Sequence, residues 1–144
     1  MKTLKQLIES KKIKKLAAVS PDQTVLQALE IMAEFDVGAL LVLDGDHLAG
    51  VFSERDYARK VILQGKGSRQ TKVSEVMTGK VVYVKQNSTI EECMAIMTEK
   101  HIRHLPVLDD NQMVIGIVSI GDVVKEMVSQ QKFIIGQLEN YITG

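Results

Sequence analysis

The sequence contains the same pattern twice, and this internal repeat restricts what the chain can fold into. Val19–Ile62 and Val84–Val128 align with one extra residue before Gly116. In both copies Val, Thr, Ile-Met, Glu, Leu, Val-Leu-Asp, Gly, Ser and Asp stand at matching places. Because two half-size units seldom bury their apolar faces separately, we expect them to pack together around a pseudo-twofold axis. Anything bound near that axis should occupy two related but non-identical sites.

Each repeat predicts the same order of elements, β-α-β-β-α. After a lead-in strand, Thr24 or Thr89 opens a helix with apolar residues at helical spacing. Two apolar strands follow around a turn, and a second helix closes the unit. The predicted strands are Leu16–Val19, Leu40–Leu43, Leu48–Phe52, Val81–Val84, Leu105–Leu108 and Met113–Val118, and the closing helices are Asp56–Leu63 and Asp122–Val128. The chain is thus predicted to be an α/β protein of two tandem β-α-β-β-α units around a pseudo-twofold axis, with short N- and C-terminal helices.

Three segments lie outside the repeated pattern. Met1–Ser10 and Lys132–Ile142 each have the spacing of an amphipathic helix, which either closes the monomer or contributes to a dimer interface. Polar and glycine residues mark Gln64–Ser74 as the connection. We expect one module over 1–144, with repeat 1 at 12–63, a connection at 64–76, repeat 2 at 77–128 and the C-terminal helix at 129–144.

Composition argues against several classes of protein. A chain of 144 residues is long enough to bury a core. Its 18 basic and 18 acidic residues balance, so no net charge favours nucleic acid or an anionic membrane, and no apolar run is as long as a membrane span. The single cysteine, Cys93, lies in a helical pattern, where we expect it to pack. One cysteine permits no intrachain disulfide and favours a reducing, cytoplasmic setting.

The candidate chemistry follows the second strand of each hairpin. Gly50–Asp56 and Gly116–Asp122 both read Gly-apolar-apolar-Ser-x-x-Asp. One interpretation is a helix cap, because serine followed three residues later by an acid resembles a capping box. The other is a binding site, since a serine hydroxyl and free amides at a helix N-terminus suit a phosphate. The two roles are compatible.

Catalysis and metal binding have less support. The chain has no nucleophile-elbow serine, P-loop or Gly-x-Gly-x-x-Gly pattern. Asp56 and Asp122 at equivalent places suggest an acid–base pair as an alternative. His101 and His104 suggest a metal, but helical spacing is lost between them and no acidic or cysteine cluster accompanies them.

The repeated unit, with its closing Gly-h-h-Ser/Thr-x-x-Asp motif, resembles the cystathionine β-synthase (CBS) domain. Two copies resemble a CBS pair, or Bateman module, from about Lys12 to Val128, and the segment His104–Asp109 (HLPVLD) fits the same resemblance. The resemblance implies a small stand-alone, non-enzymatic module. Members typically bind adenosine-containing molecules such as AMP, ADP, ATP, S-adenosylmethionine and sometimes NAD, and they use them to regulate a partner.

The resemblance also implies two clefts, each combining the motif of one repeat with the lead-in and second strands of the other. Asp56 and Asp122 would hold ribose hydroxyls, and Ser53 and Ser119 would contact ribose or phosphate. Site A would join Ser53, Arg55 and Asp56 to Val82, Arg103 and His104, and site B would join Ser119 and Asp122 to Ala17, Gly38 and Ala39.

The two implied sites differ in charge. Arg103 and His104 match the place where the regulatory subunit of AMP-activated protein kinase carries basic phosphate ligands; flanking a buried strand is the alternative role for both. Site B has Gly38 and Ala39 there. We therefore expect phosphate to bind more tightly at site A, unless the basic run Lys11–Lys15 reaches site B.

Our primary hypothesis is an adenine-nucleotide sensor, with AMP the favoured ligand and no metal required for the fold. A ligand-free dimerisation scaffold and an NAD(H)- or S-adenosylmethionine-binding regulator are the alternatives. We also expect a homodimer, because CBS pairs generally associate through helical faces, here Val25–Met32 and Ile90–Met97. The protein that this module would regulate is unknown.

Overall fold

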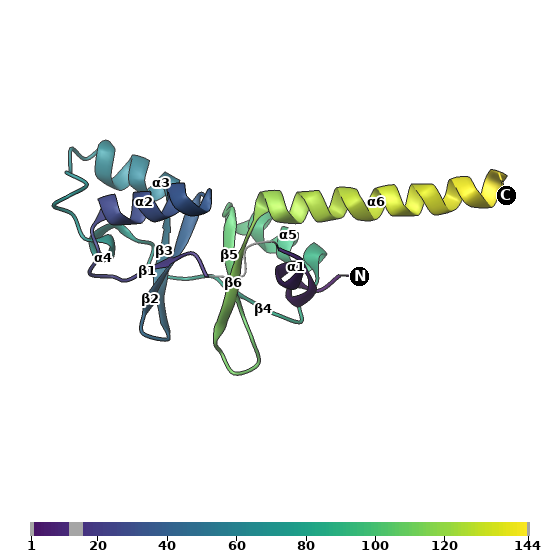
Figure 1. The fold of residues 1–144 in the computed structure, drawn as a ribbon, viewed down its shortest axis with the longest axis horizontal. Coiled ribbons are helices and arrows are strands. Elements are labelled where there is room, and N and C mark those ends of the chain that lie inside the picture. The colour runs from purple at the N-terminus through teal and green to yellow at the C-terminus, as the bar shows by residue number, and fades with distance from the viewer. Residues whose placement is uncertain (1, 12–15, 144) are drawn as a thin grey trace.

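A computed structural model describes residues 2–11 and 16–143 of the chain, so Lys12–Lys15 of the basic run lie outside the described residues. The described chain has two halves, each built around a three-stranded sheet (Figure 1). The sheets have equivalent orders, β1-β2-β3 and β4-β5-β6. In each, the first strand is parallel to the second and the third is antiparallel to it. The α/β class and the tandem β-α-β-β-α units are confirmed.

The elements follow the predicted order with small changes at their ends. The lead-in strands are only two residues long, and the first closing helix begins at Glu54 and continues as a π-helical turn, η1. The first repeat contains β1 (Ala18–Val19), α2 (Val25–Phe35), β2 (Ala39–Asp44), β3 (His47–Ser53), α3 (Glu54–Tyr57) and η1 (Ala58–Ile62); the second contains β4 (Val84–Lys85), α5 (Ile90–Lys100), β5 (His104–Leu108), β6 (Val114–Ser119) and α6 (Ile120–Thr143).

Local signals explain where the long helices begin and end. The Thr24 hydroxyl accepts from the amide of Gln27, and the Gln27 side chain accepts from the amide of Thr24, which is a capping box at the start of α2. At the start of α5 the Thr89 hydroxyl accepts from the amide of Glu92 and donates to the Glu92 carboxylate. Both helices end at a left-handed residue, Asp36 (φ 53°) or His101 (φ 55°).

Each half has its own apolar core. Val25 and Met32 of α2 lie in the first cluster, and Ile90 and Met97 of α5 lie in the second. The apolar positions that we assigned to a dimer face are therefore largely used inside the monomer. Cys93 is fully buried in the second cluster, as expected, and burial raises the pKa of its thiol to about 11.

Each repeat is covered by the helix that precedes the other repeat in the sequence. The N-terminal helix α1 (Leu4–Ser10) places Leu4 and Leu7 in the core of the second repeat, and the Leu4 amide donates to the carbonyl of Ser88 at 2.9 Å. The connection forms a second short helix, α4 (Val73–Val76), that packs on the first repeat. The N-terminal helix therefore closes the monomer, which was one of its two predicted roles.

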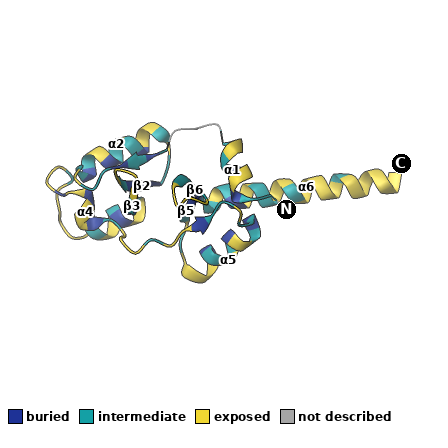
Figure 2. Cartoon of the chain, turned by 90° about the horizontal axis from the view of Figure 1, so that it is seen from below, coloured by how far each residue is buried: buried dark blue, intermediate teal, exposed yellow. Residues whose placement is uncertain are grey.

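The helix predicted at Lys132–Ile142 is present, but it is continuous with the closing helix of the second repeat. Together they form α6, which has 24 residues and only Val123 buried. No glycine or proline interrupts residues 129–131, so nothing local ends the helix there. Its outer half projects from the body of the protein and is almost wholly exposed (Figures 1 and 2). None of the described helices combines the length and apolar character needed to cross a bilayer.

Candidate ligand-binding clefts

The first cleft has a volume of about 490 Å³ and is lined by both repeats. The structure brings together there all six residues of predicted site A: Ser53, Arg55, Asp56, Val82, Arg103 and His104. Ser53 and Asp56 come from the junction of β3 and α3, whereas Arg103 directly precedes β5 and His104 begins it. The equivalence of the repeats thus places the motif of one beside the second strand of the other.

Asp56 combines a structural role with its place in the cleft. Its Oδ2 accepts from the Ser53 amide at 3.0 Å and from the Ser53 hydroxyl at 3.1 Å, and the Asp56 amide donates back to that hydroxyl. Its Oδ1 accepts from Thr78 Oγ1 at 3.1 Å and pairs with Lys60 Nζ at 3.1 Å. A carboxylate has about four acceptor positions, so its capacity is already filled. The capping box is present, and a ligand hydroxyl reaches Asp56 only by replacing a partner.

The sequence analysis missed several residues of this cleft. Thr78, Lys80, Glu54 and Val81 line it beside the predicted set. Thr78 is held against β3 by two backbone hydrogen bonds to Val51, of 2.9 and 3.1 Å. This close approach needs Gly50, because a Cβ there would lie 2.7 Å from the carbonyl oxygen of Thr78. No local pattern marks Thr78, although the motif glycine signals that some backbone passes close to β3.

Positive charge predominates in the first cleft. Arg55, Lys80 and Arg103 line it against the carboxylates of Glu54 and Asp56. One guanidinium nitrogen of Arg55 also donates to the His101 carbonyl at 3.4 Å, across the two repeats. Burial lowers the pKa of His104, outweighing the nearby carboxylates of Asp122 and Glu54 that act to raise it. The cleft therefore suits a ligand with at least one negative charge.

The second cleft is larger, at about 750 Å³, and gathers fewer of the residues predicted for site B. Ala17 and Asp122 line it. Ser119 is not part of the lining but holds Asp122, donating its amide at 2.9 Å. Ala39 is buried at the start of β2, opposite Ser53. Gly38 lies on the first cleft instead, where a Cβ would be 3.6 Å from the His104 ring.

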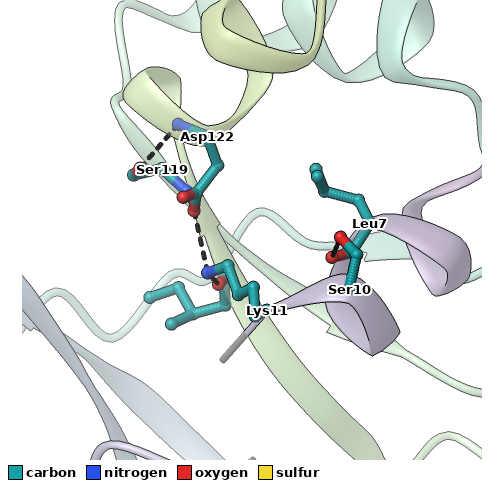
Figure 3. Close-up of polar contacts among 6 residues, drawn as sticks. Leu7, Ser10, Lys11, Ser119 and Asp122 are labelled. Carbon is teal, nitrogen blue, oxygen red and sulfur yellow. Dashed lines mark hydrogen bonds and ion pairs between the residues drawn. The ribbon is translucent and has the colours of Figure 1, made fainter. Parts of the chain in front are cut away.

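The aspartate of the second cleft is already paired with the protein's own chain. Lys11 Nζ lies 2.8 Å from Asp122 Oδ2 and donates to the Ile117 carbonyl at 2.8 Å (Figure 3). Burial acts to raise the pKa of Asp122, but the hydrogen bonds from Lys11 and Ser119 and the charge of Lys11 outweigh it, so the pKa is lowered. The first residue of the basic run thus reaches the second cleft and is bound there.

The two clefts also differ in the balance of charged residues that line them. Of the described residues, Glu9, Asp36, Asp122 and Glu126 line the second cleft against Lys11 and Lys125. This balance is negative, opposite to that of the first cleft. Neither cleft has the donors of a metal centre: over residues 2–11 and 16–143 no three His, Cys, Asp or Glu side chains are grouped to hold an ion.

Comparison with known proteins identifies the repeated unit. The CBS domain family matches residues 10–62 and 73–129. The chain is 42% identical over 128 residues to the CBS domain-containing protein CBSX3, mitochondrial, of Arabidopsis thaliana, covering 85% of this chain and 62% of that protein. It is 37% identical over 116 residues to the CBS domain-containing protein YhcV of Bacillus subtilis, covering 81% of each.

Solved structures share the fold. A protein with CBS domains from Burkholderia ambifaria superposes with a TM-score of 0.85 at 47% identity, over 90% of this chain and 96% of that one. The CBS domain pair of protein MJ0100, solved with 5'-methylthioadenosine and S-adenosyl-L-methionine, superposes with a TM-score of 0.78 over 90% of this chain and 98% of that one. At 22% identity that second likeness concerns the fold alone.

Proposed function

The chain belongs to the CBS domain family as a tandem pair, and we propose that it is a non-catalytic regulatory module that binds an adenine nucleotide in its first cleft. The observation that carries this proposal is the meeting of Arg55, Lys80 and Arg103 with the Ser53–Asp56 cap in one cavity built by both repeats. Charge-assisted contacts to phosphate are strong, and the fork of an arginine side chain matches phosphate oxygens. AMP is the ligand that we favour.

The bound state needs a small rearrangement around Asp56. A ribose hydroxyl can replace Lys60 with little disruption, because the Lys60 side chain is 44% exposed and its ammonium is readily solvated. The Ser53 amide can remain bound to Oδ2, so the cap of α3 is kept. Lys60 is then released toward solvent or toward the ligand phosphate.

The two clefts should bind unequally. A phosphate entering the second cleft meets more carboxylates than cations among the described residues, and Asp122 must give up Lys11 before it can accept a ribose hydroxyl. We therefore expect one tighter site for AMP, at the first cleft. The second should be weaker or prefer a less negatively charged ligand.

Calorimetric titration of AMP into the wild type and Arg103→Ala tests the proposal. Losing a charge-assisted hydrogen bond costs about 1.5–3 kcal/mol, so we expect roughly tenfold or more weaker binding at the tighter site. Arg69→Ala is the matched control, because Arg69 is exposed and lines neither cleft. Two equal sites in the wild type, or identical titrations for Arg103→Ala and wild type, would contradict it.

Two alternatives use the same cleft or leave it empty. A solved CBS pair holds 5'-methylthioadenosine and S-adenosyl-L-methionine, both adenosine compounds, which favours testing them beside AMP, ATP and NADH. A ligand raises thermal stability only if it binds the folded state. If none of these ligands shifts the melting temperature, the protein is a scaffold rather than a sensor.

The oligomeric state, the protein partner and the cellular compartment stay predictions. We propose that the module acts as a homodimer and passes the ligand state to a partner protein, whose identity is unknown. We also retain the cytoplasmic setting suggested by the single cysteine, although the name of the Arabidopsis relative includes the word mitochondrial.

A further inference from the structure

The helix α6 carries an apolar stripe that the described chain leaves uncovered. Val124, Val128, Ile135, Leu138 and Ile142 are 44, 43, 53, 57 and 80% exposed. With Gln131 between the second and third, their spacing alternates between four and three residues, which is the heptad pattern of a coiled-coil seam. A line of large exposed apolar side chains this long indicates an interaction surface.

The stripe runs beside the face that α6 uses within the monomer. Val123 is fully buried in the second core, and Met127 packs against that core, so this side of the helix is already occupied. Val124 and Val128 are on the neighbouring side, and the stripe continues from them along the projecting half. A covering element would therefore contact both the body and the extension.

Two charged residues indicate what covers the stripe. Between residues 127 and 143 the sequence has two charged residues, Lys132 and Glu139. Both are exposed, and neither takes part in an ion pair within the described chain. Seven residues apart, they lie along the same edge of the stripe, about 10 Å apart at 1.5 Å per residue. The helix surface is therefore positive on one side of Ile135 and negative on the other.

The charges of two copies of α6 are complementary when the two helices run in opposite directions. If a second α6 runs antiparallel, with a twofold axis near Ile135, each Lys132 lies level with Glu139 of the other copy. If it runs parallel, each charge lies level with its own equivalent. Edge charges select the partner and orientation of coiled-coil helices, so the pattern favours a second copy in the antiparallel orientation.

We propose that α6 pairs with α6 of a second copy in an antiparallel coiled coil around Ile135. The inference rests on the proposed homodimer and names its surface; it does not depend on which ligand the cleft holds. The pairing places the two CBS bodies at opposite ends of the joined helices. The C-terminus of each copy then lies near the point where α6 of the other copy leaves its body.

Sedimentation equilibrium at micromolar concentration tests the surface. The wild type should be a dimer, and Leu138→Lys should raise its dissociation constant at least about tenfold, because an apolar seam position becomes charged in both copies. Phe133→Lys is the matched control, since Phe133 is exposed but lies on the opposite side of α6, and it should leave the dimer intact. A monomeric wild type would overturn both the homodimer and this inference; a Leu138→Lys dimer of unchanged affinity would overturn the surface alone.

Charge exchange and cross-linking test the orientation. Lys132→Glu and Glu139→Lys should each weaken self-association, and the two variants mixed should form a heterodimer. When the Gln131→Cys and Ile142→Cys variants are mixed, an antiparallel pair should form a disulfide between one chain of each variant. A parallel pair would instead form a disulfide between two Ile142→Cys chains. The native Cys93 is fully buried and should not interfere. A disulfide between two Ile142→Cys chains would overturn the antiparallel orientation. A wild type that remains monomeric and floats with lipid vesicles would overturn the pairing itself.

Discussion

Single residues in this protein hold the fold and line the cleft at the same time. Ser53 and Asp56 cap α3 through reciprocal hydrogen bonds, and the same two residues line the first cleft. Two readings of the motif, cap and binding site, were compatible in the sequence, and the structure shows the cap. A ligand that uses this carboxylate therefore acts on a helix start, which gives binding a direct route to the conformation of α3.

His104 gives the stability a dependence on pH. Burial lowers its pKa below the ordinary value of 6.5, so the unfolded chain takes up a proton there more readily than the folded protein does. The free energy of unfolding should be unaffected by His104 well above pH 6.5 and should fall as the pH drops below it. Urea unfolding at pH 7.5 and pH 5.5 should show this loss, and it should be smaller in His104→Gln.

The matched control is His47→Gln, since His47 is exposed on the first hairpin, away from both clefts. That variant should keep the wild-type pH dependence. If His104→Gln and wild type lose the same free energy between the two pH values, burial of His104 does not control this part of the profile.

At the scale of elements, each motif glycine lets a segment from outside its own repeat pass close to a strand. A Cβ on Gly50 would lie 2.7 Å from the backbone oxygen of Thr78, whereas one on Gly116 would lie 3.0 Å from the end of the flexible Ile8 side chain. Gly50→Ala should therefore cost about 1–3 kcal/mol of stability, as overpacking does, and Gly116→Ala should cost less. Urea unfolding of both variants measures the difference in the free energy of unfolding. Equal losses, or a larger loss for Gly116→Ala, would show that the backbone at Thr78 moves aside as easily as the Ile8 side chain does.

The order and type of these elements could be read locally, but their long-range partners could not. Thr24 and Thr89 as caps, and Asp44–Asp46 as a turn with Gly45 at φ +63°, need only neighbouring residues. The covering of each repeat by α1 and α4 depends on contacts with segments far along the chain. The continuity of α6 could have been predicted from the sequence, because residues 129–131 contain no helix breaker. We did not predict it because we placed the end of the helix at the end of the repeat.

The candidate clefts show the same division. The shared motif located Asp56 and Asp122, because it depends only on repeated sequence. Gly38 was assigned to the second cleft by its equivalence to Arg103, yet it lies beside His104 on the first. Equivalence between repeats fixes which strand a residue belongs to. It does not fix which of the two clefts is lined by a residue that lies close to the pseudo-twofold axis.

Across the whole molecule, the exchanged covering helices should join two cores into one unfolding unit. Leu4 and Val73 are both fully buried, and neither packs in the repeat that comes next after it: Leu4 lies in the core of the second repeat and Val73 in the core of the first. Leu4→Ala should cost about 2–5 kcal/mol. Because the cores are interlocked, hydrogen exchange should speed up at β2 as well as at β5, and Val73→Ala should affect both strands with a smaller loss.

Leu63→Ala is the matched control, since Leu63 is 75% exposed and its loss should change neither strand. Faster exchange confined to β5 in Leu4→Ala, and to β2 in Val73→Ala, would show instead that the two halves unfold independently.

The exchanged helices also set an order of events as the chain leaves the ribosome. The first repeat receives α4 soon after its own strands are made, so its core can close early. By contrast, α1 is synthesised first but is covered only when β4 to β6, more than 70 residues later, have emerged. At about 5–20 residues per second, Leu4 and Leu7 wait several seconds with their apolar side chains exposed. The newborn N-terminus is therefore the segment most open to a chaperone, or to the second repeat of a neighbouring nascent chain.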